Sequence, residues 1–249
     1  MRPARTSFNG LFRSEARKAA TTPVTYGLLA AILAMTALNT ALSLSDPYSN
    51  LAASATIRHA LSAGRDFMIL FVALGAVGAA GEFRHGTAIP TFLATPVRRR
   101  VVSAKLAAYL TLGLLVALVA TALQLAITLP WLAADGHGIA PWSADIISPV
   151  IANLAAGACY SALGVGIGLL VRNQLVALIV AVAWFTIAES TLAILAPGIS
   201  RFLPGGAFSG VDTHSLQLLP LHAAIPLLAA YVATVSLLAL HTTLRRDIT

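Results

Sequence analysis

The chain alternates long apolar runs with short polar segments. Stretches without Asp, Glu, Lys or Arg cover residues 19–45, 67–81, 106–134, 146–171, 173–188 and 213–244. A helix rises about 1.5 Å per residue and needs about 20 apolar residues to cross the ~30 Å hydrocarbon core of a bilayer. The pattern therefore predicts six transmembrane helices. Their expected positions are 23–44, 60–81, 106–131, 146–170, 175–196 and 218–240.

Two of the six predicted spans are irregular. The uncharged run 67–81 reaches only about 22 Å, so we expect Arg65 and Asp66 to lie at the outer interface or to extend toward it. Glu189 interrupts the fifth span. All the runs are continuous and lack the apolar and polar alternation of barrel strands. We therefore predict an all-α integral membrane protein.

The composition agrees with this class and argues against several functions. Hydrophobic residues make up 58% of the chain and charged residues 10%, against about 25% charged in a soluble domain. Cys159 is the only cysteine, and the six histidines have no metal-ligand spacing, so we expect neither a disulfide framework nor a metal site. Neither G-x-S-x-G nor paired intramembrane Glu and His occurs, and we expect no catalytic activity and no cofactor.

The positive charges are distributed unevenly among the loops. With the N-terminus in the cytoplasm, thirteen of the sixteen Lys and Arg residues lie inside and only Arg58, Arg65 and Arg201 lie outside. Because cationic residues collect in cytoplasmic loops, we predict that both termini and residues 82–105 face the cytoplasm. The net charge of +7 then reflects orientation and contact with anionic lipid, not nucleic-acid binding. The excess of Arg over Lys and the abundance of Ala suggest a bacterial cytoplasmic membrane.

The chain divides into a polar N-terminal segment, residues 1–22, a transmembrane domain, residues 23–244, and a short tail, residues 245–249. The first segment is too polar for the apolar core of a signal peptide, so we expect the first span to be a retained anchor. Apolar residues recur in it at helical spacing, with basic residues at the sides: Phe8, Leu11, Phe12, Ala16 and Ala19 beside Arg13, Arg17 and Lys18. The spacing predicts an amphipathic helix in the inner interface. A basic, disordered N-terminus is the alternative.

The polar insert after the second span, residues 82–105, carries helix signals. Thr87 can cap a short helix over 88–94, and Thr95-Pro96 can form the N-cap and first position of a helix that leads into the third span. This insert would lie along the membrane. The segment from Gly81 to Thr87 is a near match to a phosphate-binding loop, but the required Lys is missing and no strand precedes it. We therefore reject nucleotide binding in this chain.

Polar residues at membrane depth allow more than one interpretation. Glu189 is costly there, and it is either a pathway or gate residue or a structural carboxylate paired with Ser190 or a neighbouring helix. Gln124 and Asn153 are expected to make interhelical hydrogen bonds. Small residues in two spans predict close helix packing: Gly75, Gly78 and Ala79, and Gly164, Gly166 and Gly168.

Three segments together carry a resemblance to a known family. They are GEFRHGT and TPVRRRVVSAKL after the second span, and GLLVRNQLVALIVAVAWFTIAE around the turn between the fourth and fifth spans. With six spans and an amphipathic N-terminal helix, the chain resembles the permease subunit of a type-2 ABC transporter. The resemblance implies a homodimer or heterodimer of permease chains with two separate ATP-binding subunits on the cytoplasmic side. It also implies export of a substrate by alternating access.

The resemblance assigns roles to particular residues. The insert from Glu82 to Ala94 matches the family's coupling helix, and the N-terminal segment matches its connecting helix. The implied ATPase-coupling residues are Glu82, Phe83, Arg84, Gly86, Thr87, Phe92 and Leu93. The family's substrate path involves the second and fifth spans, which makes Glu189 and Asn153 candidates for it. An autonomous channel or carrier and a non-transporting membrane scaffold are the alternative functions.

Overall fold

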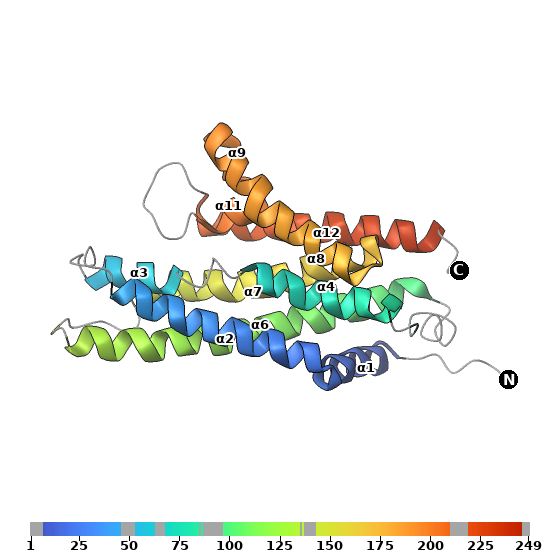
Figure 1. Cartoon of the computed structure of the whole chain (residues 1–249), viewed down its shortest axis with the longest axis horizontal. Coiled ribbons are helices and arrows are strands. Elements are labelled where there is room, and N and C mark those ends of the chain that lie inside the picture. The colour runs from blue at the N-terminus through green and yellow to red at the C-terminus, as the bar shows by residue number, and fades with distance from the viewer. Residues whose placement is uncertain are drawn as a thin grey trace.

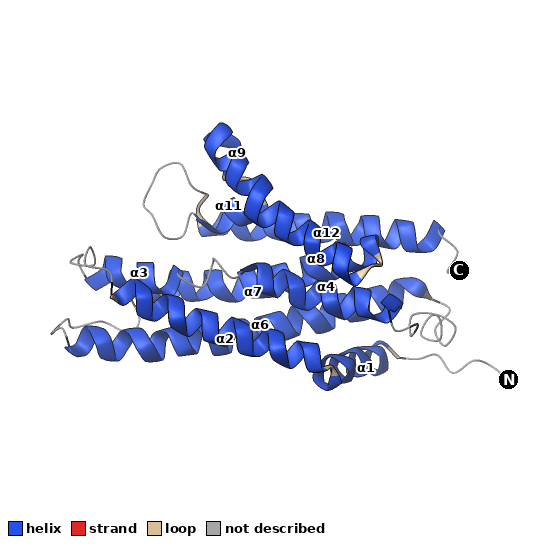
Figure 2. Ribbon diagram, viewed as in Figure 1, coloured by secondary structure: helices blue, strands red, loops and turns tan. Residues whose placement is uncertain are grey.

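The computed structural model describes residues 7–45, 53–62, 68–84, 86, 97–134, 136, 143–209 and 219–245. This part of the chain consists of helices and short connections, without a strand (Figure 2). The helices are α1 (Phe8–Thr21), α2 (Pro23–Leu44), α3 (Ala53–Ser62), α4 (Met68–Arg84), α6 (Arg98–Ala134), α7 (Ala144–Val171), α8 (Gln174–Val182), the π-helical η3 (Ala183–Ala188), α9 (Glu189–Leu195), α10 (Pro197–Ser200), α11 (Pro204–Ser209) and α12 (Leu221–Arg245).

Five helical segments in the described residues are long and apolar enough to cross a membrane. They are α2, α6, α7, the continuous segment from α8 through η3 to α9, and residues Leu221–Thr242 of α12. The protein is therefore a multi-pass, all-α membrane protein, as the sequence predicts. The 37 residues of α6 span about 55 Å, which is longer than the ~30 Å hydrocarbon core. Part of α6 must extend beyond the membrane.

The segment expected as one helix over 60–81 is not described as one. Residues 60–62 belong to α3, and α4 begins at Met68. The 17 residues of α4 cover about 25 Å, less than a full crossing. Arg65 and Asp66, expected at the outer interface, lie outside the described residues. The exact six-helix topology is therefore not established by the structure.

Helix α7 lies at the centre of the bundle and packs against α4, α6 and α12 (Figure 1). The contact between α4 and α7 is close enough to require glycine. A Cβ atom added at Gly75 would lie 1.9 Å from the Ser161 carbonyl oxygen, and one at Gly164 would lie 2.0 Å from the Val72 carbonyl oxygen. Such backbone contact increases van der Waals packing, which drives helix association in membranes. The predicted small-residue faces of these two helices are confirmed.

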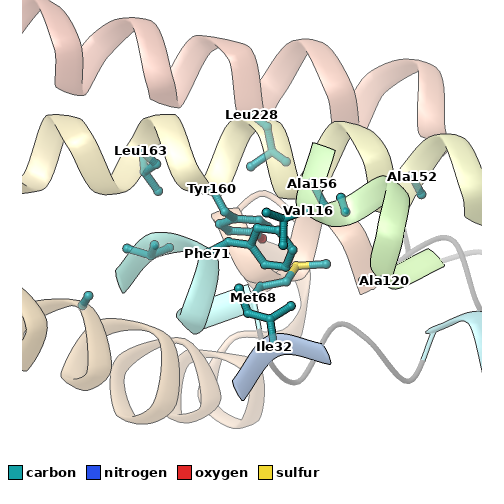
Figure 3. Close-up of a cluster of buried hydrophobic side chains, with 13 residues drawn as sticks. Ile32, Met68, Phe71, Val116, Ala120, Ala152, Ala156, Tyr160, Leu163 and Leu228 are labelled. Atoms are coloured by element: carbon teal, nitrogen blue, oxygen red, sulfur yellow. The ribbon is translucent and has the colours of Figure 1, made fainter. Parts of the chain in front are cut away.

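The apolar core lies where α2, α4, α6, α7 and α12 meet. Figure 3 shows the ring of Tyr160, from α7, directed toward Phe71, with Met68 and Ile32 beyond it. Tyr160 is fully buried, and its ring also makes an edge-on contact with Phe185 in η3. This core holds the described helices together as one bundle.

The segment from α8 to α9 differs from the other helices in its exposure. Large apolar side chains project from it, including Leu175, Ile187 and Ile194, which is 80% exposed. In Figure 1, α9 leans away from the bundle. After α9 the chain folds back: the Tyr160 hydroxyl donates a 2.6 Å hydrogen bond to the Pro204 carbonyl, and the Tyr231 hydroxyl donates one of 3.1 Å to the Phe202 carbonyl. The chain at Phe202 and Pro204, around the start of α11, is therefore anchored to α12 and α7.

Candidate functional site

Helix α1 lies across the end of the bundle where α6 begins and α12 ends (Figure 1). The Ser7 hydroxyl accepts a 3.2 Å hydrogen bond from the Gly10 N–H and caps the helix. The predicted N-terminal helix is therefore present, but its buried face differs from the expected apolar one. Leu11, Glu15 and Ala19 are buried, whereas Phe8 and Ala16 are exposed. The centre of the buried face is thus a carboxylate.

That carboxylate belongs to a network of four charged side chains from α1, α4 and α6. The Lys18 ammonium lies 2.7 Å from Glu15 Oε1 and 2.6 Å from Glu82 Oε1. The Lys105 ammonium lies 3.0 Å from Glu82 Oε1 and forms a second, very close pair with Glu15 Oε2. We call this group the ion network. Two carboxylates and two ammonium groups balance, so the network carries no net charge.

Because these side chains are largely buried, forming the network requires removing its charges from water. Loss of one partner then leaves a buried charge without compensation. Lys105 is 2% exposed, Glu15 3% and Glu82 8%, while the Lys18 side chain is 39% exposed. Burial alone raises the pKa of Glu15, but the nearby ammonium groups of Lys105 and Lys18 outweigh it and lower that pKa. Burial alone lowers the pKa of Lys18, but its hydrogen bonds and ion pairs with Glu15 and Glu82 outweigh that effect and raise the pKa. Glu15 and Lys18 therefore stay charged near neutral pH, and each depends on its charged partners.

The residues that follow Glu82 are also held by the chain itself. The Arg172 guanidinium lies over the Phe83 ring, 5.5 Å from its centroid. Arg84 Nη1 donates a 3.4 Å hydrogen bond to Gln174 Oε1. Arg172 and Gln174 belong to the short turn between α7 and α8, where Arg172 has a left-handed backbone with φ 56°. The end of α4 is thereby attached to α1 and α6 on one side and to this turn on the other.

Gly86 follows α4 with φ +66°, a conformation that L side chains rarely adopt. Thr87, Phe92 and Leu93, which the sequence analysis assigns to the coupling helix, lie outside the described residues, as does the helix expected over 88–94. The structure thus describes both ends of the insert. Glu82 begins it, Lys105 ends it, and the ion network joins the two.

Glu15 is the site residue that the sequence analysis missed. Periodicity assigns a charged residue to the solvated face of an amphipathic helix, and the buried partner of Glu15, Lys105, is 90 residues away in the sequence. One signal was present. Glu15 stands four residues after Leu11 and four before Ala19, on the stripe that those apolar residues define.

Glu189 lies elsewhere, in the fifth predicted span, and it is 8% exposed. Its Oε1 accepts a 2.8 Å hydrogen bond from Trp184 Nε1, and its Oε2 accepts one of 2.8 Å from the Gly205 N–H. The carboxylate therefore connects the π-helical turn to the start of α11. Of the two interpretations from sequence, the observed contacts match the structural carboxylate, although with partners other than Ser190.

Asn153 and Gln124 hold the end of α3. Asn153 Nδ2 donates to the Leu61 carbonyl (3.0 Å) and to Gln124 Oε1 (3.1 Å), and Gln124 Nε2 donates to the carbonyls of Ala60 (3.4 Å) and Leu61 (3.3 Å). The last carbonyls of a helix have no partner within it. The predicted interhelical hydrogen bonds of both side chains are confirmed.

No model of a protein family matches the sequence, and the search of curated proteins found no similar protein.

Proposed function

We propose that this chain is the permease subunit of a bacterial ABC exporter, which moves a substrate across the cytoplasmic membrane with energy from separate ATP-binding subunits. The observation that carries this proposal is the ion network. It joins Glu82, the first residue of the insert, to Lys105, its last residue, and both to α1. A site that receives force from a partner needs such a rigid base.

The network explains how movement of the insert would reach the membrane. Breaking a buried ion pair costs about 3–5 kcal/mol, so α1, the end of α4 and the start of α6 move as one unit. Because α4 also packs closely against α7 at Gly75 and Gly164, this unit is connected to the core of the bundle. An ATP-binding subunit that pushes on residues 85–97 would thereby shift several transmembrane helices together.

The roles of the insert residues follow from this arrangement. The side chains of Glu82, Phe83 and Arg84 contact their own chain, so they orient the insert. Phe92 and Leu93 are then the anchors that enter a cleft on the ATP-binding subunit, since buried apolar anchors supply most of the energy of a protein interface. Two permease chains pair in the membrane, and the exposed apolar face of α8 and α9 is available for that contact or for lipid.

The proposed topology has six spans, with α3 and α4 together forming the second. Ala19 of α1, Val102 of α6, Leu169 of α7 and Ala239 of α12 share one apolar cluster, so the ends of these helices lie at the same end of the bundle. That end carries most of the described cations and faces the cytoplasm by the positive-inside rule.

In a Cys159→Ser background, an impermeant thiol reagent added outside cells should label Ser45→Cys and not Val97→Cys. The reverse pattern would exclude this topology.

The function itself is tested by the neighbouring reading frames. We expect an ATP-binding subunit to be encoded beside this chain and to purify with it from detergent-solubilised membranes. Phe92→Ala should weaken that association while the permease remains folded and inserted. An exposed cation of α1 without a role in the network, Arg13→Ala, is the matched control. If the neighbouring ATP-binding subunit does not associate with the parent chain, the scaffold and channel alternatives replace the permease proposal.

A further inference from the structure

A small, mainly apolar cavity with a few polar groups lies between α2, α4, α6 and α7, beside the point where α3 ends. Its volume is about 30 Å³, and ten residues line it: Thr36, Met68, Phe71, Ala117, Ala120, Thr121, Gln124, Asn153, Ala156 and Gly157. Figure 3 shows four of these, Met68, Phe71, Ala120 and Ala156, grouped in the core. All the lining residues except Asn153 are buried.

The cavity lies well inside the membrane domain. Gln124 precedes the end of α6 by ten residues, and Asn153 follows the start of α7 by nine. At about 1.5 Å per residue, both side chains are about 14–15 Å from those helix ends. The hydrocarbon core offers no hydrogen bonds to polar groups at this depth. A polar group there must find a partner within the protein or in a bound molecule.

Three polar atoms of the lining have no such partner among the described residues. The Thr36 and Thr121 hydroxyls make no hydrogen bond in the part of the chain that the structure describes, although each residue is only 3% exposed. Other helical threonines behave differently: the Thr40 and Thr111 hydroxyls donate to the carbonyl four residues earlier. Asn153 uses its Nδ2 atom for Leu61 and Gln124, and its Oδ1 atom accepts no hydrogen bond from any described residue.

We propose that this cavity is an intramembrane binding site for water. A space of about 10–15 Å³ holds one water molecule, and a bound water needs two to four polar partners. The cavity meets both conditions, because it is large enough for one or two molecules and its two hydroxyls can donate or accept. Its described lining contains no charged side chain, so the site selects a neutral hydrogen-bonding molecule over an ion. Water here completes the polar contacts at a helix end that lies within the membrane domain.

Met68 provides a direct test, because it lines the cavity and is only 8% exposed. Under a brief X-ray pulse, bound water yields hydroxyl radicals where it sits, and these oxidise adjacent side chains. In lipid nanodiscs we expect Met68 to be oxidised faster than Met35, which is 40% exposed on the apolar surface of α2. A bulky oxidant in bulk solvent, tert-butyl hydroperoxide, should oxidise Met68 slowly. Equal or slower X-ray labelling of Met68 than of Met35, or rapid labelling by the peroxide, would overturn the proposal.

Variants then test whether labelling of Met68 depends on water bound in the cavity or on exposure of Met68 to bulk solvent. The double variant Thr36→Val, Thr121→Val keeps the side-chain shape and removes both hydroxyls, and Ala120→Val fills the space. Both should reduce X-ray labelling of Met68 several-fold. Thr111→Val removes an exposed threonine hydroxyl of the same helix and should leave the labelling unchanged. Unchanged labelling in both the double variant and the filled variant would refute the site, whatever the outcome for transport, because this inference does not depend on the proposed function.

Discussion

Lys105 on α6 and Glu15 on α1 form an ion pair that is almost completely buried, although 90 residues separate them in the sequence. The pair fixes the amphipathic N-terminal helix to the first turns of the longest helix in the bundle. The same ammonium group binds Glu82 at the end of α4. One lysine thus joins three helices at the end of the bundle that flanks the insert.

Removing both partners of this pair should cost less than the sum of the losses from removing each alone. We expect Lys105→Met to lower the free energy of unfolding by about 3–5 kcal/mol, because it leaves two buried carboxylates with Lys18 alone. Glu15→Gln should have a similar effect. The double variant should lose less than the sum of the two, as coupled residues do. Thermal unfolding in detergent measures these values, with exposed Arg17→Gln as the control. Strictly additive losses would mean that the pair does not couple.

The attachment of α1 should depend on pH only at the extremes. The pKa of Glu15 is lowered from 4.5, so its contribution is complete above that value and is lost as the pH falls through the lowered pKa. The pKa of Lys18 is raised from 10.5, so its contribution is complete below that value and is lost as the pH rises through the raised pKa. We expect a flat response between these limits.

The distance between spin labels at Arg13→Cys and Ser103→Cys, in a Cys159→Ser background, reports this attachment. Both positions are exposed, so the labels should not disturb the network. The distance should remain constant near neutral pH and increase only in strong acid or strong alkali. A transition centred between about pH 5 and pH 9 would implicate groups other than Glu15 and Lys18.

Glu189 is expected to stabilise the π-helical turn and the start of α11. Glu189→Gln keeps one acceptor oxygen, so it leaves either the Trp184 indole N–H or the Gly205 N–H without an acceptor and should lower the free energy of unfolding by about 1–3 kcal/mol. Glu189→Leu leaves the Trp184 indole N–H and the Gly205 N–H without an acceptor, at about 1–3 kcal/mol for each buried group. Thermal unfolding and the emission wavelength of Trp184 in the two variants test this. A large loss of transport in Glu189→Gln with unchanged stability would favour the pathway interpretation instead.

The contact of α4 with α7 should tolerate no side chain at Gly75. We expect Gly75→Ala to destabilise the protein by about 1–3 kcal/mol or more, because its methyl group would overlap the Ser161 carbonyl. Gly27→Ala in α2 is the matched control, since no atom lies within 4 Å of the added Cβ. Alanine is favoured over glycine in a helix by about 1 kcal/mol, so the control should be neutral or stabilising. Equal unfolding temperatures for the two variants would contradict the observed packing.

The sequence predicts the long helices well, because a run of apolar residues without charge has few alternatives in a membrane. The expected span 23–44 coincides with α2 and the span 146–170 lies within α7. The end of α3 at Ser62 could not be anticipated in the same way. Its carbonyls are satisfied by Gln124 and Asn153 from distant helices, and hydropathy contains no information about such contacts.

The candidate site was only partly predictable for the same reason. The family resemblance singled out Glu82 and Arg84, and the hydropathy pattern singled out Glu189, but their partners are set by the tertiary fold. Trp184 and Glu189 are five residues apart, a spacing that an α-helix does not bring together. The π-helical turn does, since the Glu189 N–H bonds to the Trp184 carbonyl.

The central claim, that the insert couples this chain to an ATP-binding subunit, is tested most directly by ATP hydrolysis in liposomes. The ATP-binding subunit that we expect to be encoded beside this chain is assayed alone, with the parent chain, and with two proline variants. Gly86 and Gly136 both have positive φ, and proline fixes φ near −65°. Proline therefore forces the same type of backbone strain at both positions. Gly136 lies at the opposite end of the bundle, after α6, and is the control. We predict that the parent and Gly136→Pro stimulate ATP hydrolysis and that Gly86→Pro does not. The same rate with and without the parent chain would contradict the account.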